Sequence, residues 1–324
     1  MGVLSWDPLD CIRMHEVQSE HLREVGSLLN ADGGPMLEVK IFGRLQIRCA
    51  DRSISTFPTR KVEELLAYLL LNQGVPQSRD KLIEVLWPGG PADSGRSRLS
   101  TTLWRIRVLL KNLDIPPERY LQAGSESVTF LAVGKTLIDV NLFHHFVGAA
   151  VDAPQDEKES LLFAAQALCA GDLLEGIYSD WCQIERERLA RLLLRTLGQL
   201  VNCLVERGAY EEAIDTCHKI LEIDPLREEV HRTLMVCCGY LGRRCDGIRQ
   251  FQRCANLLLT ELGVFPLPET IEVYRSLTIA AADECIEKAE PPNQERLKKT
   301  FAEFMILGDE LIELIDETQR AKRL

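Results

Sequence analysis

The chain has 324 residues, of which 46% are apolar and 27% charged, and its formal net charge is −11 at pH 7. This length and composition predict about two globular domains. No run of 18 apolar residues occurs, and the N-terminus lacks a basic stretch followed by an apolar one, so neither a membrane span nor a secretory signal is expected. The 11 cysteines are odd in number and lack the spacing of a small disulfide-bonded domain, which favours reduced thiols in a cytoplasmic protein.

Positive charge is concentrated in one part of this acidic chain. Residues 36–140 contain 15 Lys and Arg against 11 Asp and Glu, whereas residues 1–35 contain 2 against 6 and residues 141–324 contain 21 against 32. Within the basic part, residues 92–113 carry five cations and one anion in a pattern that predicts a helix. A cationic helix on a small domain is typical of proteins that bind nucleic acid.

The first half of the chain has the element order of a winged helix-turn-helix. Residues 8–30 favour a helix, and the glycine-rich residues 31–35 favour a linker. Two antiparallel strands are expected at 37–43 and 45–49. Three helices follow, at 60–72, at 79–87 with Ser78 as N-cap, and from Asp93 or Ser94 to about Asn112. Residues 119–140 are expected to form two strands around a turn at 124–126. In such a domain, assigned here to residues 36–141, the third helix enters the major groove of DNA and the hairpin is the wing.

The third helix separates into two faces. A buried stripe is expected from apolar residues three and four apart, namely Leu99, Leu103, Ile106, Leu110 and Leu113. The other side offers polar and basic residues, namely Arg98, Thr101, Thr102 and Arg105, flanked by Ser97, Ser100 and Trp104. We interpret this side as the DNA-reading face, with base register from Thr101 and Arg105; a solvated cationic face is the alternative.

Residues 142–280 are expected to form an all-α solenoid. The stretch 208–214 is matched 34 residues later by 242–248, with small residues at Ala213 and Gly247. A 34-residue helix–turn–helix period is typical of tetratricopeptide (TPR) repeats, whose concave side binds peptides or another domain. The extension 281–324 includes an amphipathic segment, 292–324, that packs on the solenoid or pairs with a second subunit to form a homodimer. The predicted fold class is therefore mainly α with a small β part: a winged helix followed by a TPR-like solenoid.

Longer stretches carry a family resemblance. They are FPTRKVEELLAYLLLNQGVPQSRDKLIEVLWP (57–88), RLSTTLWRIRVLLKNL (98–113), GDLLEGIYSDWCQIERERL (171–189), RGAYEEAIDTCHKILEIDPLREEVHRTLMVCCGYLGRR (207–244) and ELGVFPLPET (261–270). In these stretches, which together cover about 37–280, the chain resembles bacterial activators that join an OmpR-like winged helix to a bacterial transcriptional activator domain. The Streptomyces antibiotic regulatory proteins (SARP) are the best-known members.

The resemblance implies a protein that binds double-stranded promoter DNA at direct repeats and contacts RNA polymerase or a sigma factor. It implies DNA-facing side chains on the third helix at Ser97, Ser100, Thr101, Trp104 and Arg105, with Arg107 on phosphate; Arg96 and Arg98 complete the basic set.

Two positions depart from the family pattern. Position 104, usually polar or basic, is Trp, and the wing tip 124–126 lacks a cation and carries Glu126, which repels phosphate. We therefore expect the wing to contribute little to base-specific DNA binding. The alternative function is a protein-interaction scaffold in which the winged helix docks a partner through Trp104 and the acidic solenoid binds a basic peptide.

Other motifs do not predict chemistry. Val133-Gly-Lys-Thr136 ends like a phosphate-binding loop, but Thr129 stands where that loop needs glycine. Cys237, Cys238, Cys245 and Cys254 with His231 lack the paired short spacing of zinc sites, so a structural role is favoured. No nucleophile–base constellation is found, so we expect no catalytic residues, cofactor or metal, and a protein that is not an enzyme.

Overall fold

The computed structural model describes residues 36–90, 92–288, 299, 300 and 303, in two compact units with a boundary at Thr196 and Leu197. The predicted helix over 8–30 and the amphipathic segment 292–324 lie outside these residues, apart from three positions of the latter. Among the described helices, none combines the length and apolarity that crossing a membrane requires. The described chain is mainly α with two small sheets, which confirms the predicted fold class.

The first sheet joins the N-terminal strands to a strand about 100 residues later. β1 (Leu37–Lys40), β2 (Gln46–Cys49), β3 (Arg52–Ile54) and β7 (Thr136–Ile138) take the order β3-β2-β1-β7. Neighbours are antiparallel, except that β7 runs parallel to β1. The predicted strands at 37–43 and 45–49 are confirmed. The assignment of 119–140 to two strands was wrong, because its end leaves the hairpin to pair with β1.

The helix-turn-helix part follows the predicted order. α3 (Arg60–Leu71), α4 (Arg79–Leu86) and α5 (Ala92–Asn112) precede α6 (Pro117–Tyr120), which sequence patterns missed. A second sheet has the order β4-β6-β5, formed by β4 (Gln77–Ser78), β5 (Leu121–Ala123) and β6 (Ser127–Phe130). Ser78 caps α4 by accepting from the Lys81 amide, as predicted. α5 begins at Ala92, so Asp93 and Ser94 lie in its first turn rather than at its N-cap.

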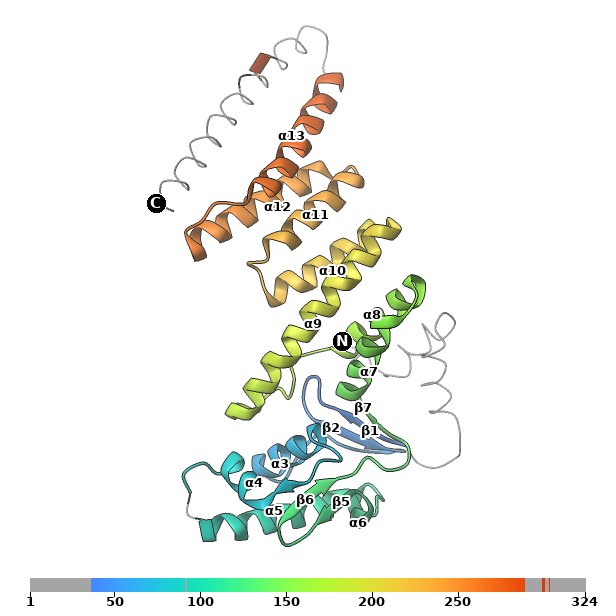
Figure 1. Ribbon diagram of the computed structural model, residues 1–324, viewed down its shortest axis with the longest axis vertical. Coiled ribbons are helices and arrows are strands. Elements are labelled where there is room, and N and C mark those ends of the chain that lie inside the picture. Colours follow the sequence, from blue (N-terminus) through green and yellow to red (C-terminus); the bar gives the residue numbers. More distant parts are fainter. Residues whose placement is uncertain (1–35, 91, 289–298, 301–302, 304–324) are drawn as a thin grey trace. The chain divides into compact units, whose positions relative to one another are not determined.

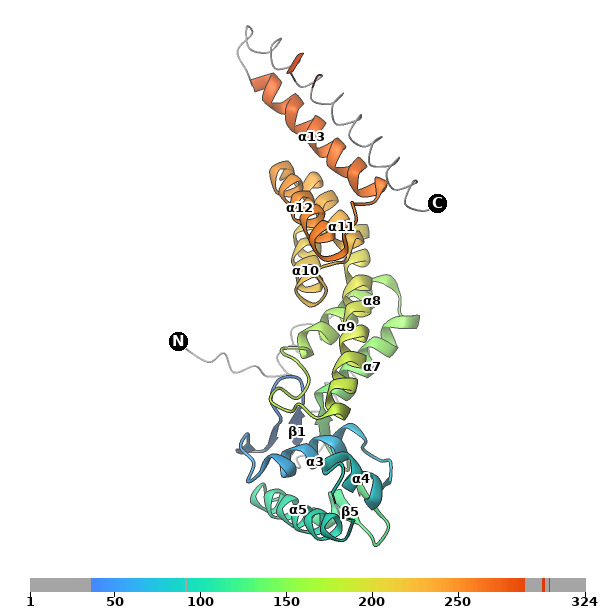
Figure 2. The ribbon, with the colours of Figure 1, turned by 90° about the vertical axis from the view of Figure 1, so that its left-hand side faces the viewer.

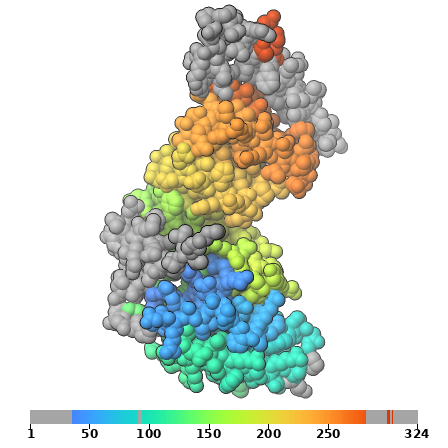
Figure 3. Space-filling model, turned by 180° about the vertical axis from the view of Figure 1, so that it is seen from behind, coloured from blue at the N-terminus to red at the C-terminus, as the bar shows by residue number. Residues whose placement is uncertain are grey.

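Figures 1 and 2 show α5 at the end of the first unit farthest from the β1–β2–β7 sheet, with the β5–β6 hairpin beside it. Residues 36–130, coloured blue to green, form one closely packed mass in the space-filling view (Figure 3). The core beneath α5 is aliphatic and aromatic, and it includes the fully buried Leu65, Leu69 and Phe130. The packing presents one side of α5 outward and holds the other against α3 and α4.

The rest of the first unit is attached to this sheet by buried polar groups. It comprises α7 (Asp139–Asp152), α8 (Gln155–Leu168) and the first part of α9 (Asp180–Arg207). The buried Asp139 carboxylate accepts hydrogen bonds from the amides of Ile41 and Phe42, at 2.7 and 2.8 Å, just after β1. Burial raises the pKa of Asp139 to about 6 despite these bonds. One carboxylate therefore joins the start of α7 to the N-terminal sheet.

A loop between α8 and α9 extends the same attachment. Leu174 and Glu175 donate backbone hydrogen bonds to the Ile41 and Gly43 carbonyls. The Arg186 guanidinium, on α9, donates to the carbonyls of this loop at distances from 2.8 to 3.2 Å. Since one guanidinium joins three carbonyls of the same loop, Arg186 is a structural residue of the first unit.

The second unit contains stacked helix pairs, described as α10 (Tyr210–Ile223), α11 (Glu228–Tyr240), α12 (Arg244–Leu257), the π-helical turn η1 (Leu258–Leu262) and α13 (Pro268–Lys288). The predicted repeat has a physical basis at its glycines. Gly208 and Gly242, which start equivalent units, both adopt positive φ, +79° and +70°. A Cβ atom on Gly247 would approach Leu277 Cδ1 to 2.7 Å, so glycine here lets α12 meet α13 closely.

Candidate nucleic-acid interface

α5 is fixed by an unusually close helix contact and by an apolar stripe. A Cβ atom on Gly95 would overlap Ile83 of α4, so only glycine permits this crossing of the helix-turn-helix. All five residues of the predicted stripe are at most 2% exposed, namely Leu99, Leu103, Ile106, Leu110 and Leu113. The stripe prediction is confirmed.

Thr102 was wrongly assigned to the outward side. It is only 5% exposed, and its hydroxyl donates to the Arg98 carbonyl at 2.8 Å. A hydroxyl bonded back to its own helix can be buried without an unsatisfied polar group, which the spacing of residues does not reveal. The neighbouring Thr101 is exposed although its hydroxyl donates to the Ser97 carbonyl at 3.0 Å, and its oxygen can still accept a hydrogen bond.

The eight predicted DNA-binding residues all lie on α5 and reach its surface. Arg105 and Arg107 are half-buried, and the exposed ones are Arg96, Ser97, Arg98, Ser100, Thr101 and Trp104. At about 100° per residue, Ser97, Thr101 and Trp104 occupy the centre of the outward side. Arg98 and Arg105 border it on one edge, and Arg96 and Arg107 on the other. The outward side of α5 therefore has a small and aromatic centre with cations along both edges.

The cations of this side are almost free of internal partners. Among the described residues, Arg98, Arg105 and Arg107 form no ion pair or side-chain hydrogen bond, and Arg96 approaches Asp80 at 3.8 Å with both groups exposed. Exposed ion pairs of this length are weak. These charges remain available for an external anion. Sequence reasoning left Val108 out of the candidate set, although it is exposed one turn after Trp104.

The wing obtains a cation from another element. The Arg79 side chain, at the start of α4, donates to the Gly124 carbonyl at 2.9 Å, and its backbone amide donates to the Glu126 carbonyl. The guanidinium thus lies at the wing turn, whose own residues 124–126 carry no cation. Since α4 and the wing are far apart in sequence, no local pattern indicated this contact.

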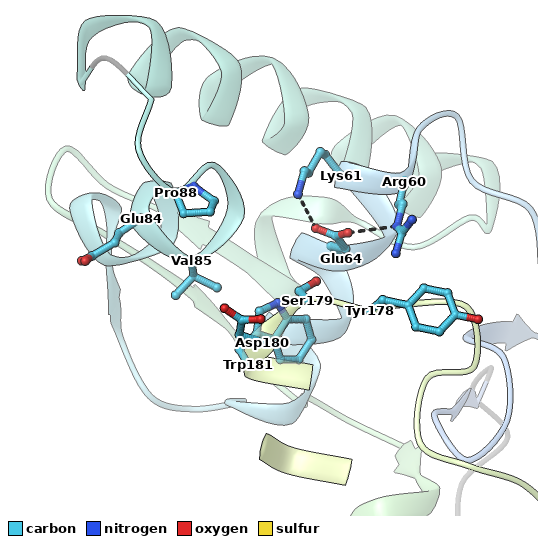
Figure 4. Close-up of a pocket in the computed structure, with 10 residues that line it drawn as sticks. All are labelled: Arg60, Lys61, Glu64, Glu84, Val85, Pro88, Tyr178, Ser179, Asp180 and Trp181. Carbon is cyan, nitrogen blue, oxygen red and sulfur yellow. Dashed lines mark hydrogen bonds and ion pairs between the residues drawn. The ribbon is translucent and has the colours of Figure 1, made fainter. Parts of the chain in front are cut away.

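A cleft of about 550 Å³ lies between α3, α4 and the residues that begin α9 (Figure 4). At its side the buried Glu64 carboxylate accepts from Arg60 and Lys61, at 3.2 and 2.7 Å, as the dashed lines show. Trp181 contacts Tyr68 of α3 edge-to-face, with ring centroids 5.2 Å apart. None of the eight predicted DNA-binding residues lines the cleft. Its contacts hold α3 and α4 against the start of α9.

His231 and the buried cysteines of the second unit occupy structural positions, whereas Cys245 is exposed. The buried His231 ring donates from Nε2 to the Pro225 carbonyl at 2.9 Å, and Nδ1 accepts from Gln250 at 2.6 Å. Burial lowers the pKa of His231 and raises that of Cys217 and Cys254 to about 12. Among the described residues, no group of three His, Cys, Asp or Glu side chains has a metal-binding arrangement. The His231 ring is used to fix helix packing.

Comparison with known proteins agrees with this architecture. The family model of the bacterial transcriptional activator domain matches residues 138–278. Regulatory protein AfsR of Streptomyces coelicolor is 27% identical over 217 residues, which are 66% of this chain and 21% of AfsR. Transcriptional regulator RedD of the same species is 29% identical over 72% of this chain and 68% of RedD. The chain thus spans only about a fifth of AfsR.

A solved structure shows the same fold. Mycobacterium tuberculosis EmbR, in complex with a low-affinity phosphopeptide, matches with a TM-score of 0.63 and 19% identity, over 85% of this chain and 71% of that one. The relatives that match along this winged helix and activator-type domain are named as regulatory proteins. By these comparisons the chain is similar to SARP-like bacterial transcriptional activators, and residues 138–278 match the activator domain of that class.

Proposed function

We propose that the protein binds double-stranded promoter DNA by inserting the outward side of α5 into the major groove, and that it activates transcription from that site. One observation carries this proposal: α5 has unpaired arginines along both edges of an exposed side, in a chain whose net charge is −11. A groove lies between two phosphate backbones, so cations on both edges match its walls while the centre faces the base pairs.

The roles of individual residues follow from their places on α5. Ser97, Ser100, Thr101 and Trp104 face the base edges, and Arg105 reaches a base from one edge. Arg96, Arg98 and Arg107 neutralise phosphates. The β5–β6 hairpin lies against the sugar-phosphate backbone of the DNA, near the Arg79 guanidinium. This assignment leaves Thr102 out, because it is buried.

The activator part acts on the transcription machinery. We assign residues 36–141 to the DNA-binding domain and 142–280 to the activator domain, which contacts RNA polymerase or a sigma factor, as the family resemblance implies. The protein then works in the cytoplasm, where promoter DNA is accessible. A homodimer on two half-sites suits DNA made of direct repeats.

The test is selection of genomic DNA fragments by the purified protein at low and at physiological salt. We expect enrichment of a repeated motif that survives physiological salt, and an affinity that falls linearly on a log–log plot against salt with a slope of about −0.9 per neutralised phosphate. Arg107→Ala should weaken all sequences alike and reduce this slope by about one. Arg195→Ala, which removes an exposed arginine of α9, is the matched control and should change neither quantity.

A second candidate function is favoured by the 61% exposure of Trp104 on the same face. An exposed indole is a common anchor of protein–protein interfaces, so α5 could dock a protein instead of DNA. That function predicts no motif enrichment at either salt, together with partner binding that Trp104→Ala abolishes. An unchanged DNA affinity in Arg98→Ala, Arg105→Ala and Arg107→Ala would also favour it.

A further inference from the structure

An apolar ridge runs along the centre of the outward side of α5. Trp104 is 61% exposed and Val108 is 36% exposed. They are four residues apart, so their side chains are neighbours on the helix surface. Clustered exposed apolar side chains, unlike single ones, commonly mark a binding surface. Both lie between the two arginine edges, where the floor of the groove would be.

The polar residues that precede Trp104 on this side cannot make the strongest purine contacts. Bidentate recognition of guanine needs a guanidinium or an ammonium, and that of adenine needs a carboxamide. Ser97, Ser100 and Thr101, which surround Trp104, carry only hydroxyls, and the Thr101 hydroxyl already donates to the Ser97 carbonyl. Arginines occur at the edges, and Lys111 and Asn112 follow Val108 in the last turn of α5. The centre of the face is thus suited to an apolar feature of DNA rather than to a hydrogen-bonding one.

The C5-methyl group of thymine is the apolar feature of the major groove. We propose that Trp104 and Val108 recognise thymine methyl groups, so that the operator contains thymines at two neighbouring base pairs under the centre of α5. This inference rests on the proposed function, in which α5 enters the major groove. Four helical residues rise about 6 Å, and base pairs are spaced by about 3.4 Å, so the ridge spans about two base pairs.

The test replaces thymine by deoxyuridine, one position at a time, in the selected operator. Deoxyuridine lacks only the methyl group and pairs identically with adenine. We expect affinity for the full-length protein to fall about fourfold at each of two neighbouring positions, as burial of one methyl group predicts, and to stay unchanged elsewhere. Replacing cytosine by 5-methylcytosine at those positions of a T→C operator should restore part of the affinity.

Variants connect the two positions to the ridge. In Trp104→Ala and Val108→Ala, the effect of deoxyuridine should disappear at the position that each residue contacts. Val151→Ala, which truncates an exposed valine of α7, is the matched control and should keep the full effect. Circular dichroism confirms that each variant is folded, as expected for exposed positions.

The outcomes separate the inference from the function on which it rests. An operator that tolerates deoxyuridine everywhere, or that responds equally in wild type and Trp104→Ala, overturns thymine recognition while DNA binding stands. An operator without thymine at the centre of each half-site does the same. If the protein enriches no DNA motif at all, the proposed function itself fails.

Discussion

The arginines of α5 and those around α12 have opposite surroundings. Arg98, Arg105 and Arg107 of α5 have no ion-pair partner among the described residues. At the start of α12, by contrast, Arg243 pairs with Glu211 at 2.9 Å and with Asp246 at 3.1 Å, and Arg249 also contacts Asp246. An arginine-rich helix is thus a candidate for binding DNA only when its counter-charges are absent. The two helices also show why a sequence count of cations alone does not locate the interface.

Removal of each set of arginines in a separate variant tests whether their surroundings matter for DNA binding. The triple variant Arg98→Ala, Arg105→Ala and Arg107→Ala should lower DNA affinity about 10²-fold at physiological salt, since each lost arginine contact, to a phosphate or to a base, is worth about fivefold there. The matched triple variant of α12, Arg244→Ala, Arg249→Ala and Arg253→Ala, should leave affinity within twofold. Fluorescence anisotropy with the selected operator measures both. Equal losses in the two variants would mean that only net charge matters.

Buried polar groups extend the comparison to stability. Asp139 of the first unit has a pKa raised to about 6, so its protonation favours the folded state and its contribution to stability falls as pH rises from about 4 through 6. His231 of the second unit has a lowered pKa, so the folded state favours the neutral ring and stability is lost as pH falls below about 6.5. The two groups therefore act in opposite directions.

Urea unfolding of Asp139→Asn and His231→Gln, each compared with wild type at pH 4.5 and pH 7, separates these contributions. Relative to Asp139→Asn, the free energy of unfolding of wild type should be higher at pH 4.5 than at pH 7, by at most about 3 kcal/mol. The difference for His231→Gln should shift the other way. A pH-independent difference for Asp139→Asn would show that its carboxylate does not titrate in this range.

Each unit also contains a glycine at a close helix contact. Gly95→Ala should destabilise the first unit by about 1–3 kcal/mol, because its Cβ atom overlaps Ile83, and should also weaken DNA binding by moving α5. Gly247→Ala should destabilise the second unit, because its Cβ atom would crowd Leu277, and should leave the affinity for the operator unchanged. Gly148→Ala, in open space on α7, is the control and should be stabilising by about 0.5–1 kcal/mol. Thermal unfolding that ranks the three variants differently would contradict these contacts.

The sequence could predict what is periodic or local. The stripe of α5, its length and the Ser78 cap follow from residue spacing and capping chemistry, and the structure has them. Contacts between distant segments could not be read in this way. The parallel pairing of β7 with β1 requires a crossover connection of almost 100 residues, and the contact of Arg79 with the wing depends on tertiary packing. Thr102 was misassigned because its hydroxyl is satisfied by its own helix.

A charge change at the wing should alter DNA affinity only modestly. Glu126 is exposed at the tip of the β5–β6 hairpin and would face phosphate, whereas the Arg79 guanidinium beside the turn would attract it. Glu126→Lys should raise affinity about fivefold and steepen the salt dependence by about 0.9, because a cation replaces an anion beside the backbone. Asp152→Lys, an equal charge change at the end of α7, should do neither. If both variants bind more tightly by the same factor, the wing does not approach the DNA, and the interface is confined to α5.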